Sequence, residues 1–197
     1  MRVIVINKRK VGITLILIGL MFIIFGAGKK FDTRLKFVAL IQNNITSLQK
    51  YDALDKHFNY KLPTEWKTSE ETFGGDEIIY HNNFHSPDMI IQGYVEVWNL
   101  KEDLKAFLDR SKNVAGQYNK YKEYSLKPIK INGHEGYLMD YSIQTKDQIY
   151  YKGYEYFLKN NNKFLRFSFF VREGNFKENM PTIFDTIVAT FSYDEGN

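Results

Sequence analysis

The chain has 197 residues, a formal net charge of +4 and no cysteine. Without thiols it can form no disulfide, cysteine nucleophile, thiolate metal site or lipid-modified cysteine. The positive charge is unevenly distributed, because residues 1–56 carry a balance of +7 and residues 57–197 a balance of −3. The larger part of the chain would therefore repel a phosphate backbone, and we expect no nucleic acid among its partners.

An uncharged stretch near the N-terminus, Val11–Gly28, reads VGITLILIGLMFIIFGAG. As a helix it would be roughly 27 Å long, which is close to the thickness of the hydrocarbon core of a bilayer. The sequence therefore predicts a transmembrane anchor over residues 11–28, so that the membrane itself is a partner.

Basic side chains flank the anchor about equally on both sides, so the positive-inside rule alone does not decide its orientation. We expect residues 1–10 to form a basic cytoplasmic tail and the remaining chain to lie outside the cytoplasm, because nothing before the anchor requires translocation. The anchor is then an uncleaved signal anchor, although the small residues Gly26–Gly28 leave cleavage open.

The residues after the anchor follow a helical pattern. Apolar side chains recur every three or four positions, at Phe31, Leu35, Val38, Ile41, Ile45, Leu48 and Tyr51. This spacing predicts a helical connector over residues 29–56. The connector is either a stalk that lies on the membrane or on the following domain, or a short self-associating coil.

Residues 57–197 are expected to form one domain that folds by itself. Alternating patterns predict strands at Phe58–Leu62, Glu77–Asn82, Met89–Leu100, Tyr124–Ile131, Gly136–Thr145, Tyr150–Leu158 and Lys163–Val171. Two helices are predicted, one after Asn99 as N-cap and extending to Tyr118, and one that starts at Pro181. Asn132-Gly133 predicts a tight hairpin. The fold class is therefore α+β, an antiparallel sheet flanked by helices and preceded by one N-terminal transmembrane helix.

Two short motifs, Tyr60–Trp66 and Ile131–Gly133, resemble parts of a known family, the PsbP-like superfamily. Tyr60–Trp66, YKLPTEW, looks like its opening strand, and Ile131–Gly133 before a strand looks like its central hairpin. The superfamily includes the Ran-binding Mog proteins and the bacterial DcrB-type proteins, and its fold is an antiparallel sheet flanked by helices. The resemblance covers about residues 57–193 and implies a non-enzymatic binding or accessory domain. The metal and partner residues of the plant photosystem protein have no recognisable counterpart here.

Two histidines, His81 and His85, have the spacing of two metal ligands on one helix face. This segment instead reads as a strand end, and a strand separates residues four apart by about 13 Å. We therefore expect no metal site and no cofactor. The sequence contains no nucleophile, phosphate-binding or dinucleotide-binding motif, so we expect that the chain is not an enzyme.

The predicted sheet has one apolar face and one face that mixes aromatic and charged side chains. The candidate binding surface comprises Tyr94, Glu96, Trp98, Tyr150, Lys152, Tyr154, Tyr156 and Arg166. Aromatic side chains with polar tips are common at binding surfaces. The alternative is that a helix, such as Phe31–Phe58, covers this face.

These observations predict a single-pass membrane protein with an extracytoplasmic, non-enzymatic binding or accessory domain and a protein partner at the membrane. A cell-surface hydrolase with an unrecognised site and a cytoplasm-facing adaptor are the alternatives.

Overall fold

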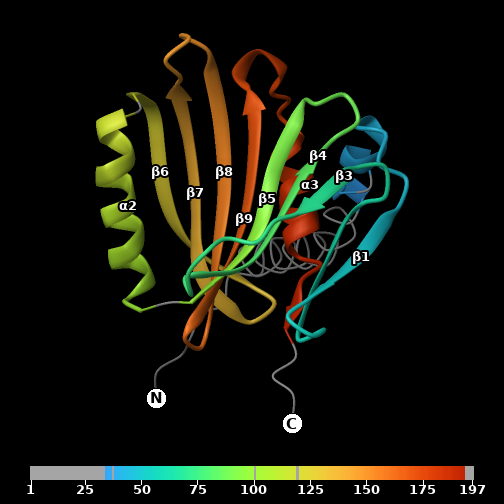
Figure 1. Ribbon diagram of the computed structural model, residues 1–197. Helices are drawn as coiled ribbons and strands as arrows, with labels where there is room; N and C mark the ends of the chain where they lie inside the picture. The colour runs from blue at the N-terminus through green and yellow to red at the C-terminus, as the bar shows by residue number, and fades with distance from the viewer. Residues whose placement is uncertain (1–33, 37, 100, 119, 194–197) are drawn as a thin grey trace, which may run out of the picture.

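A computed structural model describes residues 34–36, 38–99, 101–118 and 120–193 of the chain. The predicted tail (1–10) and the predicted anchor (11–28) lie outside the described residues. Within the described ranges, no helix combines the length and the apolar character that crossing a bilayer requires. The described residues form two antiparallel sheets, and helices pack on both sides of the larger one (Figure 1).

The larger sheet has seven strands. Their order is β3 (Lys67–Glu70), β4 (Ile78–His85), β5 (Ile91–Asn99), β9 (Lys163–Arg172), β8 (Tyr150–Asn160), β7 (His134–Gln144) and β6 (Lys120–Ile131). Every neighbouring pair is antiparallel. The edge strand β6 carries four lysines and Pro128.

The smaller sheet has three strands in the order β1 (Leu48–Ala53), β2 (Phe58–Pro63) and β10 (Ser192–Tyr193). It packs with helix α3 (Met180–Val188) on one face of the larger sheet. The short helix η1 (Glu173–Asn175) connects β9 to the segment before α3.

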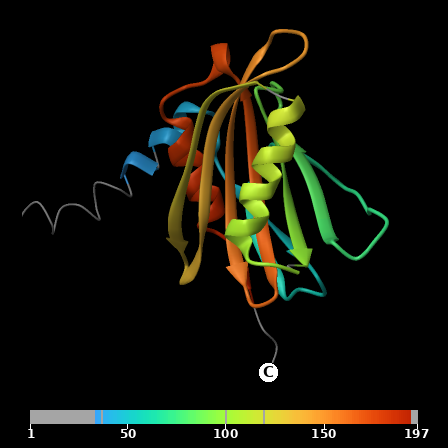
Figure 2. The ribbon, with the colours of Figure 1, turned by 90° about the vertical axis from the view of Figure 1, so that its left-hand side faces the viewer.

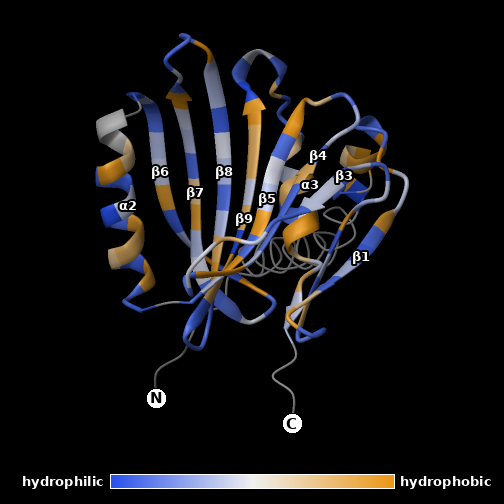
Figure 3. Cartoon of the chain, in the orientation of Figure 1, coloured by the Kyte–Doolittle hydropathy of each residue, from blue (hydrophilic) through white to orange (hydrophobic). Residues whose placement is uncertain are grey.

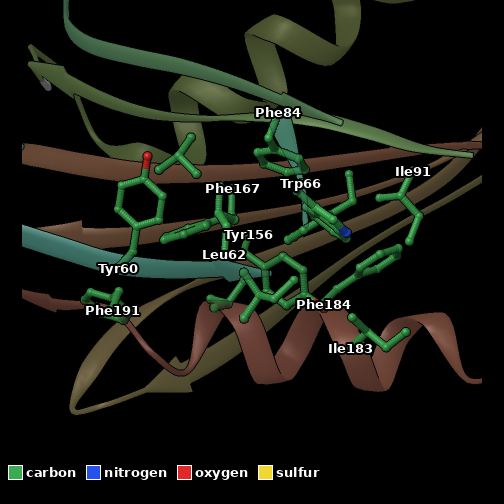
Figure 4. Packing of buried hydrophobic residues seen from close by; sticks show 14 of the residues in the cluster. Tyr60, Leu62, Trp66, Phe84, Ile91, Tyr156, Phe167, Ile183, Phe184 and Phe191 are labelled. Atoms are coloured by element: carbon green, nitrogen blue, oxygen red, sulfur yellow. The ribbon is translucent and has the colours of Figure 1, made fainter. Parts of the chain in front are cut away.

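The main core lies between the larger sheet, the smaller sheet and α3. Alternate residues of β5, including Ile91, Val95 and Val97, point into this core and are at most 4% exposed. Trp66 stacks on Phe84 with 5.2 Å between ring centroids at one end of the core (Figure 4). Figure 3 shows the resulting bands of hydrophilic and hydrophobic residues along the strands.

Helix α2 (Leu104–Tyr118) packs on the opposite face of the larger sheet (Figure 2). Its buried residues Leu104 and Leu108 contact a second apolar cluster that includes Met139, Phe157 and Phe164. The larger sheet is therefore covered by α3 and the smaller sheet on one side and partly by α2 on the other.

The α+β class and the antiparallel sheet flanked by helices are confirmed. Asn132 and Gly133 have φ angles of 50° and 86°, as the predicted tight hairpin requires. Pro181 lies in the first turn of α3, where its missing N–H leaves no helical hydrogen bond unmade.

The prediction of a helical connector is wrong for Leu48–Ala53. These residues form β1 and pair with β2 along its whole length, with Tyr51 opposite Tyr60 and Ala53 opposite Phe58. Only residues 34–36 and 38–42 are helical among the described residues before β1. Ala39, Ile45 and Ala53 belong to the main core, so the folded unit begins well before residue 57.

The predicted N-cap of α2 is also wrong. Asn99 is the last residue of β5, and its side-chain amide donates to the backbone carbonyl of Asp76. Asp103 caps the helix instead, because its Oδ1 accepts from the N–H groups of Lys105 at 2.9 Å and Ala106 at 3.2 Å. The short strand β3 was not predicted, since all four of its residues are exposed and polar.

Candidate functional site

The candidate site is built on the face of the larger sheet that α2 partly covers. Glu96 of β5 lies opposite Arg166 of β9, and Arg166 lies opposite Phe157 of β8. Paired residues of adjacent strands point to the same face, and so does Glu155, two positions before Phe157. The strand register therefore brings two carboxylates and one guanidinium together in the middle of the sheet.

Arg166 links the two carboxylates. Its Nε donates to Glu155 Oε2 at 2.7 Å, and its Nη2 lies 2.5 Å from the same oxygen. Its Nη1 donates to Glu96 Oε2 at 3.3 Å. The carboxylate side chains are 6% and 4% exposed, whereas that of Arg166 is 22% exposed. Buried carboxylates require such partners, because an unpaired buried charge is strongly unfavourable.

Two aromatic rings hold the guanidinium between them. The Arg166 Cζ lies 4.9 Å from the centroid of the Tyr94 ring and 5.4 Å from that of Phe157. Burial by itself lowers the pKa of Arg166, but the charges of Glu155, of the phenolate form of Tyr94 and of Glu96 outweigh it, so that this pKa is raised. Burial, followed by the charge of Glu155, raises the pKa of the Tyr94 hydroxyl. Arg166 is therefore a fixed positive charge in this site.

Tyr141 of β7 completes the surroundings of Glu155. Its hydroxyl donates to Glu155 Oε1 at 2.6 Å, and Ser168 Oγ donates to Oε2 at 2.9 Å. The pKa of Tyr141 is raised well above its ordinary value by burial and by the charge of Glu155. Tyr141 pairs with Gly153, and a Cβ atom at Gly153 would overlap the Tyr141 ring.

His81 of β4 holds the other carboxylate. Its Nδ1 lies 2.8 Å from Glu96 Oε1, and its Nε2 lies 3.0 Å from Asn83 Oδ1. The Asn83 amide is oriented by its own donation to Glu71 Oε1 at 2.8 Å. Both ring nitrogens thus face side-chain oxygens, so His81 links Glu96 to Asn83.

A cleft of about 260 Å³ lies between α2 and this network. Its walls are mostly apolar and come from the sheet and from α2, including Phe107, Leu108, Met139 and Ile143. Glu155, Tyr141 and Arg166 line its polar part, and Ser111, Lys112 and Ala115 line it from α2. An apolar pocket with a few oriented polar groups is the usual form of a small-molecule site.

The structure separates the predicted binding surface into two groups. Tyr94, Glu96, Trp98 and Arg166 lie together on the face with α2, and Trp98 Nε1 donates to Glu96 Oε2 at 2.7 Å. The other four residues point to the opposite face, because Tyr156 pairs with Phe167 of the main core. The helix on the first face is α2, and not the segment Phe31–Phe58.

The second group mostly contributes to packing. Tyr156 is 1% exposed and donates to Asp185 Oδ1 at 2.8 Å. Tyr154 stacks on Phe176, and burial raises its pKa to about 12. Lys152 pairs with Glu123 at 3.2 Å, and Tyr150 is 37% exposed beside Lys122.

The sequence prediction missed Glu155, Tyr141 and His81 as members of the site. A usable signal existed for Glu155. The alternation Gly153, Glu155, Phe157 places a charge in the middle of a long strand, on the face opposite to that of its even-numbered tyrosines. Tyr141 and His81 join the site through the pairing of strands, which no local pattern specifies.

His81 and His85 both lie on β4, which extends three residues beyond the predicted strand end at Asn82. His81 bonds to Glu96 and Asn83, while His85 Nδ1 lies 2.9 Å from the carbonyl oxygen of Ser86. No group of three or more histidine, aspartate or glutamate residues within the described part of the chain could hold a metal ion.

No protein-family model matches the chain, and no curated protein sequence matches it. Among solved structures, the chain is similar to cyanobacterial PsbP (CyanoP) from Synechocystis, with a TM-score of 0.55 and 14% identity over 76% of this chain and 94% of that one. The fold is PsbP-like. A second similar structure is that of a Bacteroides thetaiotaomicron protein, with a TM-score of 0.52 and 17% identity over 76% of this chain. The chain spans 50% of that protein's length, and identities this low show the fold alone.

Proposed function

We propose that the chain is a single-pass membrane-anchored protein whose PsbP-like domain lies outside the cytoplasm and binds a small ligand without catalysis. The observation that carries this proposal is the cleft between α2 and the network of Glu96, Arg166 and Glu155. The protein partner expected at the membrane from the sequence stays a proposal.

The polar groups of the cleft favour binding over chemistry. Both oxygens of Glu155 and both oxygens of Glu96 already accept hydrogen bonds from groups of the domain. A carboxylate whose oxygens hold groups of its own domain is less free to reach a substrate as a general base. These carboxylates instead serve to hold Arg166 in place beside the cleft.

The charges indicate the class of ligand. Glu155 lines the cleft and would repel an anion there. Arg166 and Lys112 also line it and would repel a cation. Arg166 makes three contacts with the carboxylates, and a guanidinium has five N–H groups. Further N–H groups can therefore donate to a ligand. The ligand favoured is therefore uncharged, with an apolar or aromatic body and a hydrogen-bond acceptor.

Benzamide, benzoate and benzylammonium test this class, because they share one ring and differ in charge. Saturation-transfer NMR is measured on the full chain in lipid nanodiscs. We expect benzamide to bind, and the two ions to bind at least about tenfold more weakly.

Two variants of α2 locate the binding. Ala115→Trp fills the cleft and should abolish the benzamide signal, whereas Val114→Trp, at a position that is 52% exposed, should retain it. An unchanged signal in Ala115→Trp, with the melting temperature retained, would move the ligand elsewhere and refute the proposal.

The orientation in the membrane is tested separately. The chain has no cysteine, so Glu135→Cys, with a parent side chain that is 82% exposed, gives a single reactive thiol. A membrane-impermeant maleimide should label this thiol on intact cells. Labelling that requires permeabilised cells would support the cytoplasm-facing adaptor instead.

A further inference from the structure

Residues 34–36 and 38–42, the first helical ones among the described residues, expose an apolar face. They are called here the N-terminal helical segment. Leu35, Val38 and Ile41 recur at steps of three and are 60%, 47% and 54% exposed. In a helix on a soluble domain, the outward face normally carries polar residues. Three large aliphatic side chains on one outward face therefore indicate that something other than water contacts them.

The opposite face of the segment is fixed to the domain. Ala39 is 3% exposed in the main core, and Leu40 packs against the same core. Gln42 Oε1 accepts from Asn179 Nδ2 at 2.8 Å, directly before α3. Figure 2 shows the segment in blue beside α3 in red.

The end of the segment is also fixed. Asn44 has a φ of 57°, and its N–H donates to the carbonyl of Ile41 at 2.9 Å. The N–H of Ile45 donates to the carbonyl of Leu40 at 3.0 Å. These two hydrogen bonds form a Schellman motif, and Leu40 and Ile45, at the positions where such a motif is usually apolar, both pack with the main core. The outward face therefore has a fixed direction relative to the domain.

The position of the segment in the chain indicates what it faces. Leu35 lies seven positions after Gly28, the end of the predicted anchor. Seven residues span about 10 Å as a helix and at most about 25 Å when extended. Four Lys or Arg and one Asp fall within residues 29–36. An apolar face bordered by basic residues is typical of a helix that lies in the headgroup region of an anionic bilayer.

The same face is too small to hold two copies together. A coiled coil needs a sustained heptad pattern, and the segment has about two turns. A stable dimer buries on the order of 800 Å² on each partner, far more than three partly exposed side chains supply.

We propose that Leu35, Val38 and Ile41 insert into the surface of the bilayer that holds the anchor, which orients the whole domain against the membrane. This inference rests on the membrane anchoring proposed above. It adds a second contact with the lipid and a defined orientation.

The test uses single-cysteine variants of the full chain in vesicles of phosphatidylcholine and phosphatidylglycerol. Leu35→Cys, Val38→Cys and Ile41→Cys each carry an environment-sensitive fluorophore, and nitroxide-labelled lipids serve as quenchers. Leu20→Cys is the control for the anchor, and Glu135→Cys is the control for the distant domain surface. Because the three test positions are exposed, the melting temperature should not change.

We expect the nitroxide lipids to quench Leu20→Cys and the three segment labels, the latter at least about twofold more strongly than Glu135→Cys. Quenching of Leu20→Cys alone would refute the inference while leaving the anchor intact. Absence of quenching at Leu20→Cys would refute the anchoring and the inference together. Cross-links between copies at residues 35, 38 and 41 without lipid quenching would show a self-associating helix and refute the inference.

Discussion

The ring of Tyr141 occupies the space that a side chain at Gly153 would fill on the neighbouring strand. This arrangement lets the Tyr141 hydroxyl reach the buried Glu155 at 2.6 Å. Glu155 in turn holds Arg166, so the absence of a side chain at one position supports the geometry of the whole network.

Gly153→Ala should therefore destabilise the domain by about 1–3 kcal/mol, because its Cβ displaces the Tyr141 ring and strains the packed face. Urea unfolding measures the change. Gly74→Ala is the matched control, since a Cβ there meets nothing within 4 Å and should have little effect. Equal stability of the two variants would contradict the contact described between Tyr141 and Gly153.

Arg166→Met should cost about 3–5 kcal/mol, because two buried carboxylates lose their shared counter-charge. The further changes Glu96→Gln and Glu155→Gln should recover part of this loss, since they remove both charges and keep acceptors. Lys105→Met, which breaks an exposed pair with Asp109 on α2, is the control and should leave the unfolding midpoint unchanged. A loss no greater than that of the control would show that the network contributes little.

The buried hydroxyl of Tyr60 should make the domain lose stability at alkaline pH. Burial is the main cause that raises its pKa from 10.0 to about 12. The unfolded chain then releases this proton first, so the stabilisation is complete below about pH 10 and is lost as the pH rises towards 12.

Tyr60→Phe should be less stable at neutral pH by about 1–3 kcal/mol, because Asn82 Nδ2 loses the hydroxyl that it bonds at 2.7 Å. Between pH 10 and 12 its stability should fall less steeply than that of the parent. Urea unfolding across this range measures both slopes, and parallel curves would rule out Tyr60 as a source of the alkaline loss.

The N-terminal boundary gives a prediction about fragments. Residues 57–197 lack β1 and the buried Ala39 and Ile45, so β2 is left with an open edge. We expect this fragment to aggregate, or to melt roughly 10 °C or more below residues 34–197. Scanning fluorimetry and gel filtration compare the two fragments. Equal melting temperatures would show that β1 is an accessory to an already complete core.

The strands of the larger sheet could be predicted because burial on one face imposes an alternation that is visible in each segment, as at Ile91, Val95 and Val97. β1 could not be predicted, because its less exposed residues Leu48, Tyr51 and Ala53 follow no clear alternation, and the segment forms a strand by pairing with β2. Local sequence preference was overridden there by tertiary pairing.

The candidate site could be predicted only within single strands. Tyr94, Glu96 and Trp98 were correctly placed on one face by their spacing in β5. Whether Tyr156 or Phe157 joins them depends on the register between β8 and β9, and a shift of one residue exchanges the two faces. That register depends on the tight turn at Asn161 and Asn162 and on the packing of both strands, so the sequence of β8 alone does not contain the answer.

The lysines of β6 bear on how copies of the domain would meet if they are tethered to a membrane, as proposed above. Tethered copies move in two dimensions and meet far more often than free ones, and an open sheet edge is where they would join. Lys120, Lys122, Lys127 and Lys130 line that edge, and Pro128 removes one of its N–H donors. Two such edges repel each other, so under the membrane tethering proposed above, crowding would not join the copies into a continuous sheet.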